Sequence, residues 1–598
     1  MKFGCECEMI KTDVTIKEKL GQLIMMDFRH WGCDKQENPI PMTEASSEIL
    51  SLIQQYHLGS VILFRENIQN TAQTVSLLRN LQSASELPLF LGVDQEGGIV
   101  NRLQQGTTTP GNMLLGATGD TQCAEDMADV IGAELSVLGF NLNFAPTLDI
   151  NSNQNNPIIG IRSFSDDAET VWAMGEAYIK GLQQQNIIPC VKHFPGHGDT
   201  EQDTHAGLAA IRRGKLELEQ QELYPFVQAC DAQVEMVMVA HVTVPALDNT
   251  MHISKKDDRN VGIPASLSYE ILTNLLRKKM GYQGLLVTDA LDMHAISLHF
   301  GQIEATIKCI LAGVDMAMMP IRVWGEEDIP AFARLFDDLE KEYLNNERFA
   351  SRVEESYQRI ISFKQCKKLL ENPIFTLDDG EHIAKAEKMV SGQSHHQREI
   401  SVARKGVTLL KNDGLLPFKL QEGQQILILD TCDIRLGLTK NLLQKIVKEC
   451  QLIINIQTQQ IEDQEALSEA LKKDIAAADL TLLLSENLQS LKTLTNVITQ
   501  FAKEHSYPLV NVACNRPYDI AYLPSAKNYL CIYGASSFDQ TNGTMSKLEV
   551  NLLGGFETLF MSNEGKILNN PQGKLPVTIR HGETKEVLFA RRNGLPYE

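Results

Sequence analysis

Short apolar runs rich in β-branched residues alternate with longer amphipathic segments from about residue 60 to residue 320. Apolar positions recur every three or four residues in the longer segments, which is the period of a helix. Strand–helix alternation over such a length predicts a parallel sheet. The predicted strands are Ser60–Phe64, Pro88–Asp94, Leu142–Pro146, Ile187–His193, Met236–His241, Leu285–Asp289 and Asp315–Met319, and the predicted helices include Ala124–Leu138, Ala168–Gln183, Lys215–Ala229 and Tyr269–Lys279.

An eighth, less clear run at Gly21–Asp27 completes the series. Eight parallel strands, each followed by a helix, are typical of a closed barrel. We therefore predict that residues 1–365 form an N-terminal (β/α)₈ TIM-type barrel. Residues 366–398 read as a charged, helical connector, within which Gly392–Gln397 is a polar linker.

A second α/β unit is expected over residues 399–598, as a C-terminal α/β sandwich domain. Its apolar runs, separated by helical patterns, fit an open doubly wound sheet. The first run leads into Thr431 and Cys432 without a glycine-rich phosphate loop, so we expect no nucleotide site there. We expect this domain to pack against the barrel and to do no chemistry. The predicted strands are Ile426–Leu429, Leu452–Ile456, Leu480–Leu484, Leu509–Ala513 and Tyr529–Ile532.

Composition narrows the class of protein. The chain is 43% hydrophobic and 22% charged, with a formal net charge of −21, which argues against a nucleic-acid surface. We expect no membrane span, because no run approaches about 18 apolar residues. The N-terminal segment lacks the apolar core and cleavage site of a signal peptide. Four of the twelve cysteines lie in apolar runs as buried thiols do, so we expect a reduced, cytoplasmic protein: Cys190, Cys309, Cys514 and Cys531.

Ionisable residues close several of the predicted strands at their C-terminal ends. Asp94, Lys192 with His193, His241 and Asp289 all stand there. Any one of them could be a strand-end cap. Because the C-terminal face of such barrels carries the active site, four ionisable strand ends on one face indicate a site.

The segment Val191–Leu208, VKHFPGHGDTEQDTHAGL, concentrates three histidines, two aspartates and a lysine among glycines. His193 and His197 are four residues apart, but Pro195 and Gly196 between them preclude the helical geometry of many zinc sites. A zinc or manganese site built from a loop is an open alternative. The other interpretation is a glycine-hinged loop that presents Asp203 and His205 to a pocket, with the carboxylate orienting and charging the imidazole.

These motifs resemble glycoside hydrolase family 3, and within it the NagZ-like β-N-acetylglucosaminidase branch. The resemblance covers nearly the whole chain. Its most specific motif is KHFPGHGDT, from Lys192, followed by Asp203-Thr204-His205. The other matching segments are DQEGG from Asp94 with Arg102 after it, NFAPTLDINSNQNNPIIGIRSF ending at Phe164, AHVTVPALD ending at Asp248, PASLS ending at Ser268, VTDALDM from Val287 to Met293, ARKGVTLLKNDGLLPF from Ala403 to Phe418 and GKLPVTI from Gly573 to Ile579.

The resemblance implies a retaining exo-β-N-acetylglucosaminidase that acts on terminal β-linked GlcNAc, on peptidoglycan (muropeptide) fragments. It implies Asp289 as the nucleophile and His205, held by Asp203, as the acid/base. It implies no metal and no other cofactor; the oligomeric state stays open. The residues that it implies for binding the sugar are Asp94, Arg102, Arg162, Lys192 and His193.

Two departures from the family pattern and several rival functions are relevant. Ile99 stands where the family often has arginine, and Ser562–Asn570 replaces a tighter glycine-rich turn. A phosphorylase and a β-glucosidase are the rival enzymes, and a saccharide-binding barrel without catalysis is the rival outside enzymes. The D-x-H motif disfavours the glucosidase, and a nucleophile opposite a proton donor disfavours the pure binder.

Overall fold

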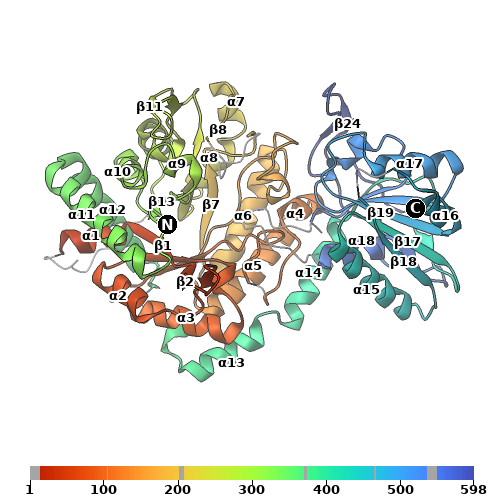
Figure 1. Ribbon diagram of the computed structural model, residues 1–598, viewed down its shortest axis with the longest axis horizontal. Coiled ribbons are helices and arrows are strands. Elements are labelled where there is room, and N and C mark those ends of the chain that lie inside the picture. The colour runs from red at the N-terminus through yellow and green to blue at the C-terminus, as the bar shows by residue number, and fades with distance from the viewer. Residues whose placement is uncertain are drawn as a thin grey trace.

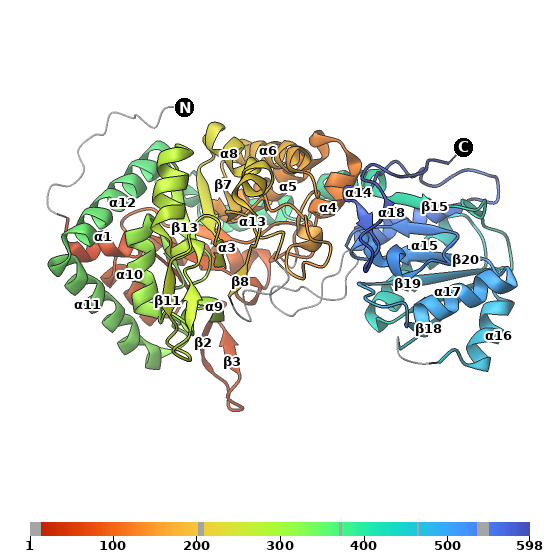
Figure 2. The ribbon, with the colours of Figure 1, turned by 90° about the horizontal axis from the view of Figure 1, so that it is seen from above.

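The computed structural model describes residues 14–103, 105–200, 208–369, 373–462, 466–534 and 549–597. Two domains lie side by side along the long axis of the molecule, the barrel at one end and the C-terminal domain at the other (Figures 1 and 2). In the part of the chain that is described, no helix is both long enough and apolar enough to cross a membrane.

Eight parallel strands form the barrel, in the order β13-β9-β7-β6-β5-β4-β1-β14. All eight sequence-predicted runs are present, including the unclear one at Gly21–Asp27. The outermost strands meet at a single parallel bridge between Val287 and Met316, which closes the ring. The strands are β1 (Ile24–Asp27), β4 (Ser60–Leu63), β5 (Phe90–Val93), β6 (Leu142–Asn143), β7 (Ile188–Phe194), β9 (Met236–Val239), β13 (Leu285–Thr288) and β14 (Ala317–Met318).

Beside this closure, Asp315 is fully buried just before β14. Its carboxylate accepts a hydrogen bond from the backbone N–H of Leu286 on β13, at 2.9 Å, and binds Arg277 at 2.6 Å and Arg359 of α12. Burial would raise the pKa of Asp315, but the arginines hold it at about 2. The seam of the barrel is thus tied to the surrounding helices through one carboxylate.

Helices surround the barrel, and their buried apolar residues belong to the same cluster as those of the strands. The predicted helix Lys215–Ala229 is divided into two helices. Proline disfavours a helix interior but suits the first turn, and Pro225 lies in the first turn of the second helix. The predicted helix Tyr269–Lys279 is the π-helix η4 (Glu270–Lys279). The α-helices are α1 (Ile16–Gln22), α2 (Ser47–Gln55), α3 (Thr71–Ser83), α4 (Asn112–Thr118), α5 (Thr121–Leu138), α6 (Ala168–Gln184), α7 (Lys215–Gln220), α8 (Tyr224–Asp231), α9 (His294–Ser297), α10 (Gln302–Ala312), α11 (Ile329–Asn345) and α12 (Glu347–Cys366).

Two helices lead from the barrel to the second domain. α13 (Asp379–Met389) lies below the barrel in Figure 1, and α14 (Gln393–Gly406) runs from it to the C-terminal domain. Gly392–Gln397, predicted as a polar linker, is the N-cap and first turn of α14. Polar residues are common both in linkers and in exposed first turns of helices, so the sequence pattern does not distinguish the two.

The C-terminal domain has a six-stranded sheet in the order β15-β21-β20-β19-β17-β18, parallel except for β15. Alternate residues of β17 pack on its two faces: Ile426 and Ile428 against α15 (Asp433–Glu449) and α18 (Glu549–Leu559), and Leu427 and Leu429 against α16 (Glu469–Ala477) and α17 (Leu494–His505). This is the predicted doubly wound arrangement. The strands are β15 (Thr408–Lys411), β17 (Gln425–Asp430), β18 (Asn455–Gln460), β19 (Leu480–Ser485), β20 (Leu509–Ala513) and β21 (Tyr529–Cys531).

The two domains are in direct contact. Leu575, Val577 and Ile579 of the C-terminal domain are buried in the same apolar cluster as the barrel core. Gly116 of α4 lies at this contact, since a Cβ there would lie 3.2 Å from the Cβ of Pro576 in the C-terminal domain. The loops of the barrel are therefore positioned in part by the second domain.

Candidate active site

A pocket of about 320 Å³ opens at the C-terminal ends of the barrel strands. Its volume lies at the lower end of the range for small-ligand sites. Six of the eight residues predicted from the sequence line this one pocket: Asp94, Arg102, Arg162, Lys192, His193 and Asp289. The other two, Asp203 and His205, lie outside the described residues, between Thr200 and Leu208.

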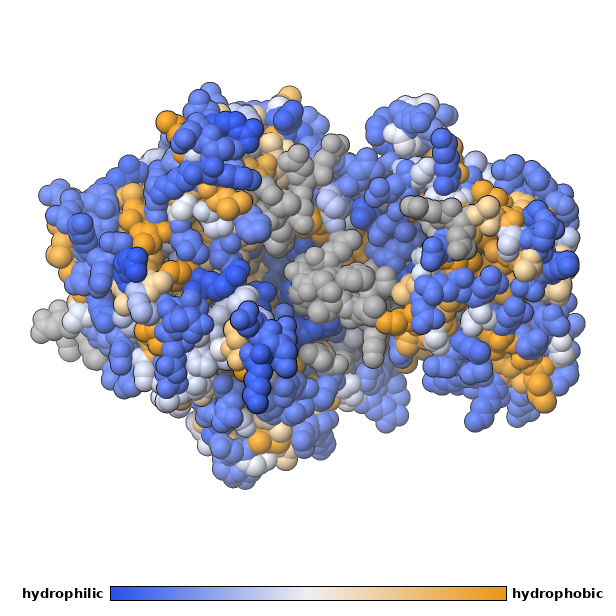
Figure 3. Space-filling model, viewed as in Figure 1, coloured by the Kyte–Doolittle hydropathy of each residue, from blue (hydrophilic) through white to orange (hydrophobic). Residues whose placement is uncertain are grey.

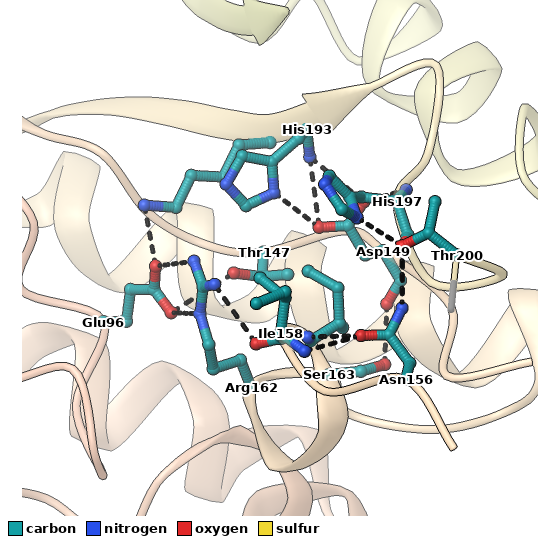
Figure 4. A network of polar contacts seen from close by, with 12 residues as sticks. Glu96, Thr147, Asp149, Asn156, Ile158, Arg162, Ser163, His193, His197 and Thr200 are labelled. Carbon is teal, nitrogen blue, oxygen red and sulfur yellow. Dashed lines mark hydrogen bonds and ion pairs between the residues drawn. The ribbon is translucent and has the colours of Figure 1, made fainter. Parts of the chain in front are cut away.

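Glu96 organises one wall of the pocket. It is buried two residues after Asp94, and its carboxylate accepts two hydrogen bonds from Arg162, at 2.7 and 2.9 Å (Figure 4). The Nζ of Lys192 lies 2.7 Å from the same carboxylate and 2.6 Å from that of Asp94. Paired, doubly hydrogen-bonded charges of this kind fix side chains in one geometry.

The electrostatics of this wall favour the charged forms of Glu96 and Lys192. Burial alone would raise the pKa of Glu96, but Arg162 and Lys192 hold it well below its ordinary value. Burial also disfavours the ammonium of Lys192, yet Asp94 and Glu96 keep its pKa above the ordinary value. The wall therefore presents fixed cations and a carboxylate to whatever enters, as recognition of a hydroxyl pattern requires.

Asp149 holds the second wall, which β7 provides. The Nδ1 of His193 lies 2.7 Å from Asp149 Oδ2, and the backbone N–H of His197 donates to Asp149 Oδ1 at 2.7 Å. Figure 4 shows both imidazoles beside this buried carboxylate. With Nδ1 bound, Nε2 is the ring nitrogen of His193 that is left to contact a ligand. His197 binds Thr200 through its Nδ1, at 2.9 Å, and burial lowers the pKa of His197 to about 4.

Asp289 directly follows β13 and is partly exposed in the pocket. Its backbone N–H donates to the carbonyl oxygen of Val239, and its Oδ1 accepts from the backbone N–H of Ala290 at 2.8 Å. Beneath it, His241 is buried between Ser266 and the carbonyl oxygen of Ala290. The sequence left His241 undecided between pocket and scaffold; its ring contacts make it a support for the turn that carries Asp289.

The mouth of the pocket has charged residues that the sequence interpretation missed. Arg29, Asp292 and Arg322 line it. The guanidinium of Arg29 stacks 3.6 Å from the ring centre of Phe64, and that of Arg322 4.2 Å from the ring centre of Trp324. Burial raises the pKa of Asp27, beneath Arg29, to about 6, against the opposing effect of that arginine. Asp27 is an ionisable residue at the end of the predicted run Gly21–Asp27, and this strand-end position is the sequence signal that could have identified it.

Glu96 and Asp149 were also missed as site residues, although both stand in the quoted motifs. Both are buried, Glu96 within the lining of the pocket and Asp149 behind His193 and His197. Among the described residues, no three His, Cys, Asp or Glu side chains are grouped as metal ligands. The pocket can enclose one polar ring between fixed charges and present the Asp289 carboxylate to it.

Comparison with known proteins gives a consistent result. Residues 15–363 match the description "Glycosyl hydrolase family 3 N terminal domain". Beta-hexosaminidase A of Pseudoalteromonas piscicida is 42% identical over 426 residues, which are 68% of this chain and 69% of the relative. The Beta-N-acetylglucosaminidase/beta-glucosidase of Cellulomonas fimi is 28% identical over 539 residues, 87% of this chain and 89% of the relative.

The fold as a whole is also found among solved structures. That of a glycoside hydrolase family 3 beta-N-acetylglucosaminidase from Paenibacillus sp. str. FPU-7 superposes with a TM-score of 0.75 at 29% identity. The alignment covers 95% of this chain and all of that one. The barrel and the C-terminal domain thus occur together in that protein.

Proposed function

Because the chain belongs to glycoside hydrolase family 3, we propose that it is a retaining exo-β-N-acetylglucosaminidase that releases terminal β-linked GlcNAc. The observation that carries the proposal is the convergence of Asp289 with five predicted sugar-binding residues in one pocket of about 320 Å³. The family relatives named for hexosaminidase activity support the choice of GlcNAc.

In the proposed mechanism the carboxylate of Asp289 attacks the anomeric carbon as the bond to the leaving oxygen breaks. His205 gives its proton to that oxygen, so that an alcohol departs and a glycosyl ester forms on Asp289. Water then attacks the same carbon, its proton passes to His205, and the carboxylate leaves. Asp203 is assigned the orientation of the His205 ring. The assignment of Asp203 and His205 rests on the sequence motif alone.

Binding of the sugar is assigned to the two walls. The ammonium of Lys192 has three N–H donors, and Asp94 and Glu96 take two of them, which leaves one for a hydroxyl. Asp94 offers its carboxylate to hydroxyl donors, and Arg102, Arg162 and His193 offer N–H groups. Since Glu96, Asp94 and Asp149 already fix Arg162, Lys192 and His193, these three side chains lose little conformational entropy when the sugar binds.

We place the reaction in the turnover of peptidoglycan fragments and in the cytoplasm. The family branch that the motifs resemble supports the first part of this proposal. The buried cysteines, as expected of a reduced protein, support the second part. Cys190, Cys309, Cys514 and Cys531 are all buried.

One incubation series tests the activity. Chitobiose and nitrophenyl glycosides of GlcNAc and glucose are incubated with and without phosphate, and the products are weighed by mass spectrometry. We expect free GlcNAc from chitobiose in both conditions and a rate on the GlcNAc glycoside at least about tenfold above that on the glucoside. GlcNAc 1-phosphate as the main product would show that the protein is a phosphorylase and not a hydrolase. A preference for the glucoside would overturn the substrate assignment.

A further inference from the structure

A serine, a histidine and a glutamate meet where the connecting helix α14 begins. The Oγ of Ser391 lies 2.7 Å from Nε2 of His396, and Nδ1 of His396 lies 2.8 Å from Oε1 of Glu399. The pocket that holds Asp289 is lined by other residues. A hydroxyl bonded to a base that a third group orients is the arrangement that activates serine for covalent catalysis.

The sequence at the start of the helix produces this arrangement. α13 ends at Met389 and Gly392 is the N-cap of α14, so Ser391 directly precedes the cap. The residue before an N-cap meets the fourth residue of the helix, which here is His396. Glu399 follows His396 by three residues and therefore lies on the same face of the helix.

Glu399 is placed as the orienting member of such a triad. Its side chain is 7% exposed, and its second carboxylate oxygen accepts a hydrogen bond from the backbone N–H of Thr109 at 3.2 Å. Since the carboxylate accepts the Nδ1–H of His396, the Nε2 of that ring carries the lone pair that accepts the proton of Ser391. The side chain of His396 is 44% exposed, so the base can be reached from solvent.

The backbone of Ser391 is held in one conformation. Its φ of +57° lies in the left-handed region, where a residue with a side chain persists only if its surroundings maintain it. The N–H of Ser391 donates to Oε1 of the buried Glu134 at 2.9 Å, and the N–H of Gly392 donates to the carbonyl oxygen of Met389 at 3.1 Å. The hydroxyl is thus presented from a fixed turn, as a preorganised nucleophile requires.

The start of α14 offers hydrogen-bond donors for a developing negative charge. Its N-cap, Gly392, has no side chain that could cap the helix. The first turn of a helix leaves its N–H groups free, and within the described parts of the chain those of Gln393 and Ser394 form no hydrogen bond. Such N–H groups, together with the positive end of the helix dipole, stabilise an oxyanion. They lie within three residues of Ser391.

The surroundings suit a small, polar substrate. The cavity lined by Val390, the residue before Ser391, has a volume of about 10 Å³, enough for about one water-sized group such as a methyl. Figure 3 shows a mostly hydrophilic surface below the boundary of the two domains, where Figure 1 places the start of α14. An acetyl group fits these surroundings, whereas a long acyl chain would stay exposed to water.

We propose that Ser391, His396 and Glu399 form a second catalytic site, which hydrolyses small esters such as acetyl esters. The Oγ of Ser391 attacks the acyl carbon while His396 takes its proton. The ester C–O bond then breaks, His396 returns the proton to the leaving alcohol, and the acyl group remains on Ser391. Water attacks this acyl-enzyme with His396 again as the base, and the carboxylic acid and the free serine are released. This activity is separate from the glycosidase proposed above.

Diisopropyl fluorophosphate is the probe for an activated serine. It should phosphorylate Ser391 with release of fluoride, and mass spectrometry of peptides from the full-length protein should find the label there. Glu399→Gln should slow the labelling at least about tenfold, because the imidazole loses its orienting carboxylate. Ser394→Ala, which removes an exposed serine from the same helix start, should leave the labelling unchanged. A protein without label on Ser391 would overturn the proposal.

The rate of nitrophenyl acetate hydrolysis gives a second readout. Ser391→Ala should lower kcat/KM for this ester at least about tenfold, whereas Ser394→Ala should keep the wild-type value. Both variants should hydrolyse nitrophenyl GlcNAc as the wild type does, and Asp289→Ala should keep the full rate on the ester.

Two results would contradict this expectation. Equal ester rates of Ser391→Ala and wild type, even with a lower melting temperature of the variant, would reduce the three residues to a cap of the helix. Loss of the ester rate in Asp289→Ala would assign ester hydrolysis to the barrel pocket. Since the ester and the GlcNAc glycoside are assayed separately, failure of the glycosidase proposal is distinguishable from failure of this one.

Discussion

Asp289 is the residue on which the proposed chemistry depends most. Asp289→Ala should lower kcat by at least about a thousandfold, because the variant lacks the carboxylate that is proposed to attack the anomeric carbon. The melting temperature should change little, since the side chain is partly exposed. A 5-fluoro GlcNAc-type inhibitor should label a peptide that contains Asp289, as mass spectrometry would show. A label on a different peptide would transfer the role of nucleophile to that site.

His205 and Asp203 should behave as one unit. A proton donor matters most for a poor leaving group, so His205→Ala should lose far more rate on a disaccharide than on a nitrophenyl GlcNAc. Asp203→Ala should show the same pattern more mildly, because it only orients and charges the ring. Added azide should partly restore His205→Ala on the nitrophenyl substrate. Equal losses on both substrates would make His205 a binding residue.

His197 should make stability depend on pH. Burial lowers its pKa to about 4 in the folded protein, whereas the unfolded imidazole titrates near about 6.5. Between these values the unfolded chain binds the proton and the folded protein does not, so stability is full above pH about 6.5 and falls as the pH is lowered. The loss reaches about 2 kcal/mol at pH 5.

The corresponding measurement is the melting temperature of wild type and His197→Gln at pH 7 and pH 5. The variant should show the smaller acid-induced decrease. An equal decrease in both proteins would assign the acid sensitivity to other groups.

Six of the eight site residues predicted from the sequence line one pocket. They were predictable because ionisable strand ends and family motifs mark side chains that face a ligand. It missed Glu96 and Asp149, which lie in the same motifs. Their role is to hold Arg162 and His193, and that depends on which side chains meet across the barrel. Such a pairing joins residues 66 and 44 positions apart, and a single sequence does not reveal it.

At the level of elements, the loops after β6 and β7 are locked together at Gly198. A Cβ there would lie 1.6 Å from the carbonyl oxygen of Ile150, a contact that backbone movement alone can relieve. Gly198→Ala should therefore separate the two loops and lower kcat/KM about tenfold or more through displacement of Asp149 and His197.

Gly214→Ala is the matched control, since nothing lies within 4 Å of its Cβ position. Its activity on nitrophenyl GlcNAc should equal that of the wild type. Full activity of Gly198→Ala in the same assay would show that the loops tolerate the shift.

The strands were predictable because each buried run of a parallel sheet is apolar throughout and ends at a polar residue. The edge strand was not. The predicted run Leu452–Ile456 pairs as β18, Asn455–Gln460, because Leu452 still closes α15 through a bond to Val447. An edge strand with alternating exposure carries polar residues, so the apolar run beside it was taken for the strand.

At the level of the whole molecule, the C-terminal domain reaches the active-site loops through Arg516. Its guanidinium donates to the carbonyl oxygen of Asn156 at 3.1 Å, and its side chain packs beside Gly160, two residues from Arg162. Arg516→Ala should raise the KM for nitrophenyl GlcNAc several-fold with a smaller effect on kcat, because the loop that carries Arg162 loses its support.

Arg404→Ala is the control for this variant. It breaks an ion pair with Glu557 between α14 and α18, away from those loops. It should lower the melting temperature and leave KM unchanged. Equal KM values for Arg516→Ala and wild type would confine the C-terminal domain to a stabilising role.

The barrel closes at the single bridge between Val287 and Met316, and β13, the strand on one side of this junction, is directly followed by Asp289. The strands β13 and β14 pair over this one bridge, whereas β4 and β5 pair over four residues, so amide protons of 286–288 and 315–318 should exchange with solvent sooner than those of β4 and β5. Asp315, clamped by arginines, limits the amplitude of that opening. Asp289, the proposed nucleophile, thus directly follows the strand at this short junction, where we expect small adjustments of the backbone to cost least.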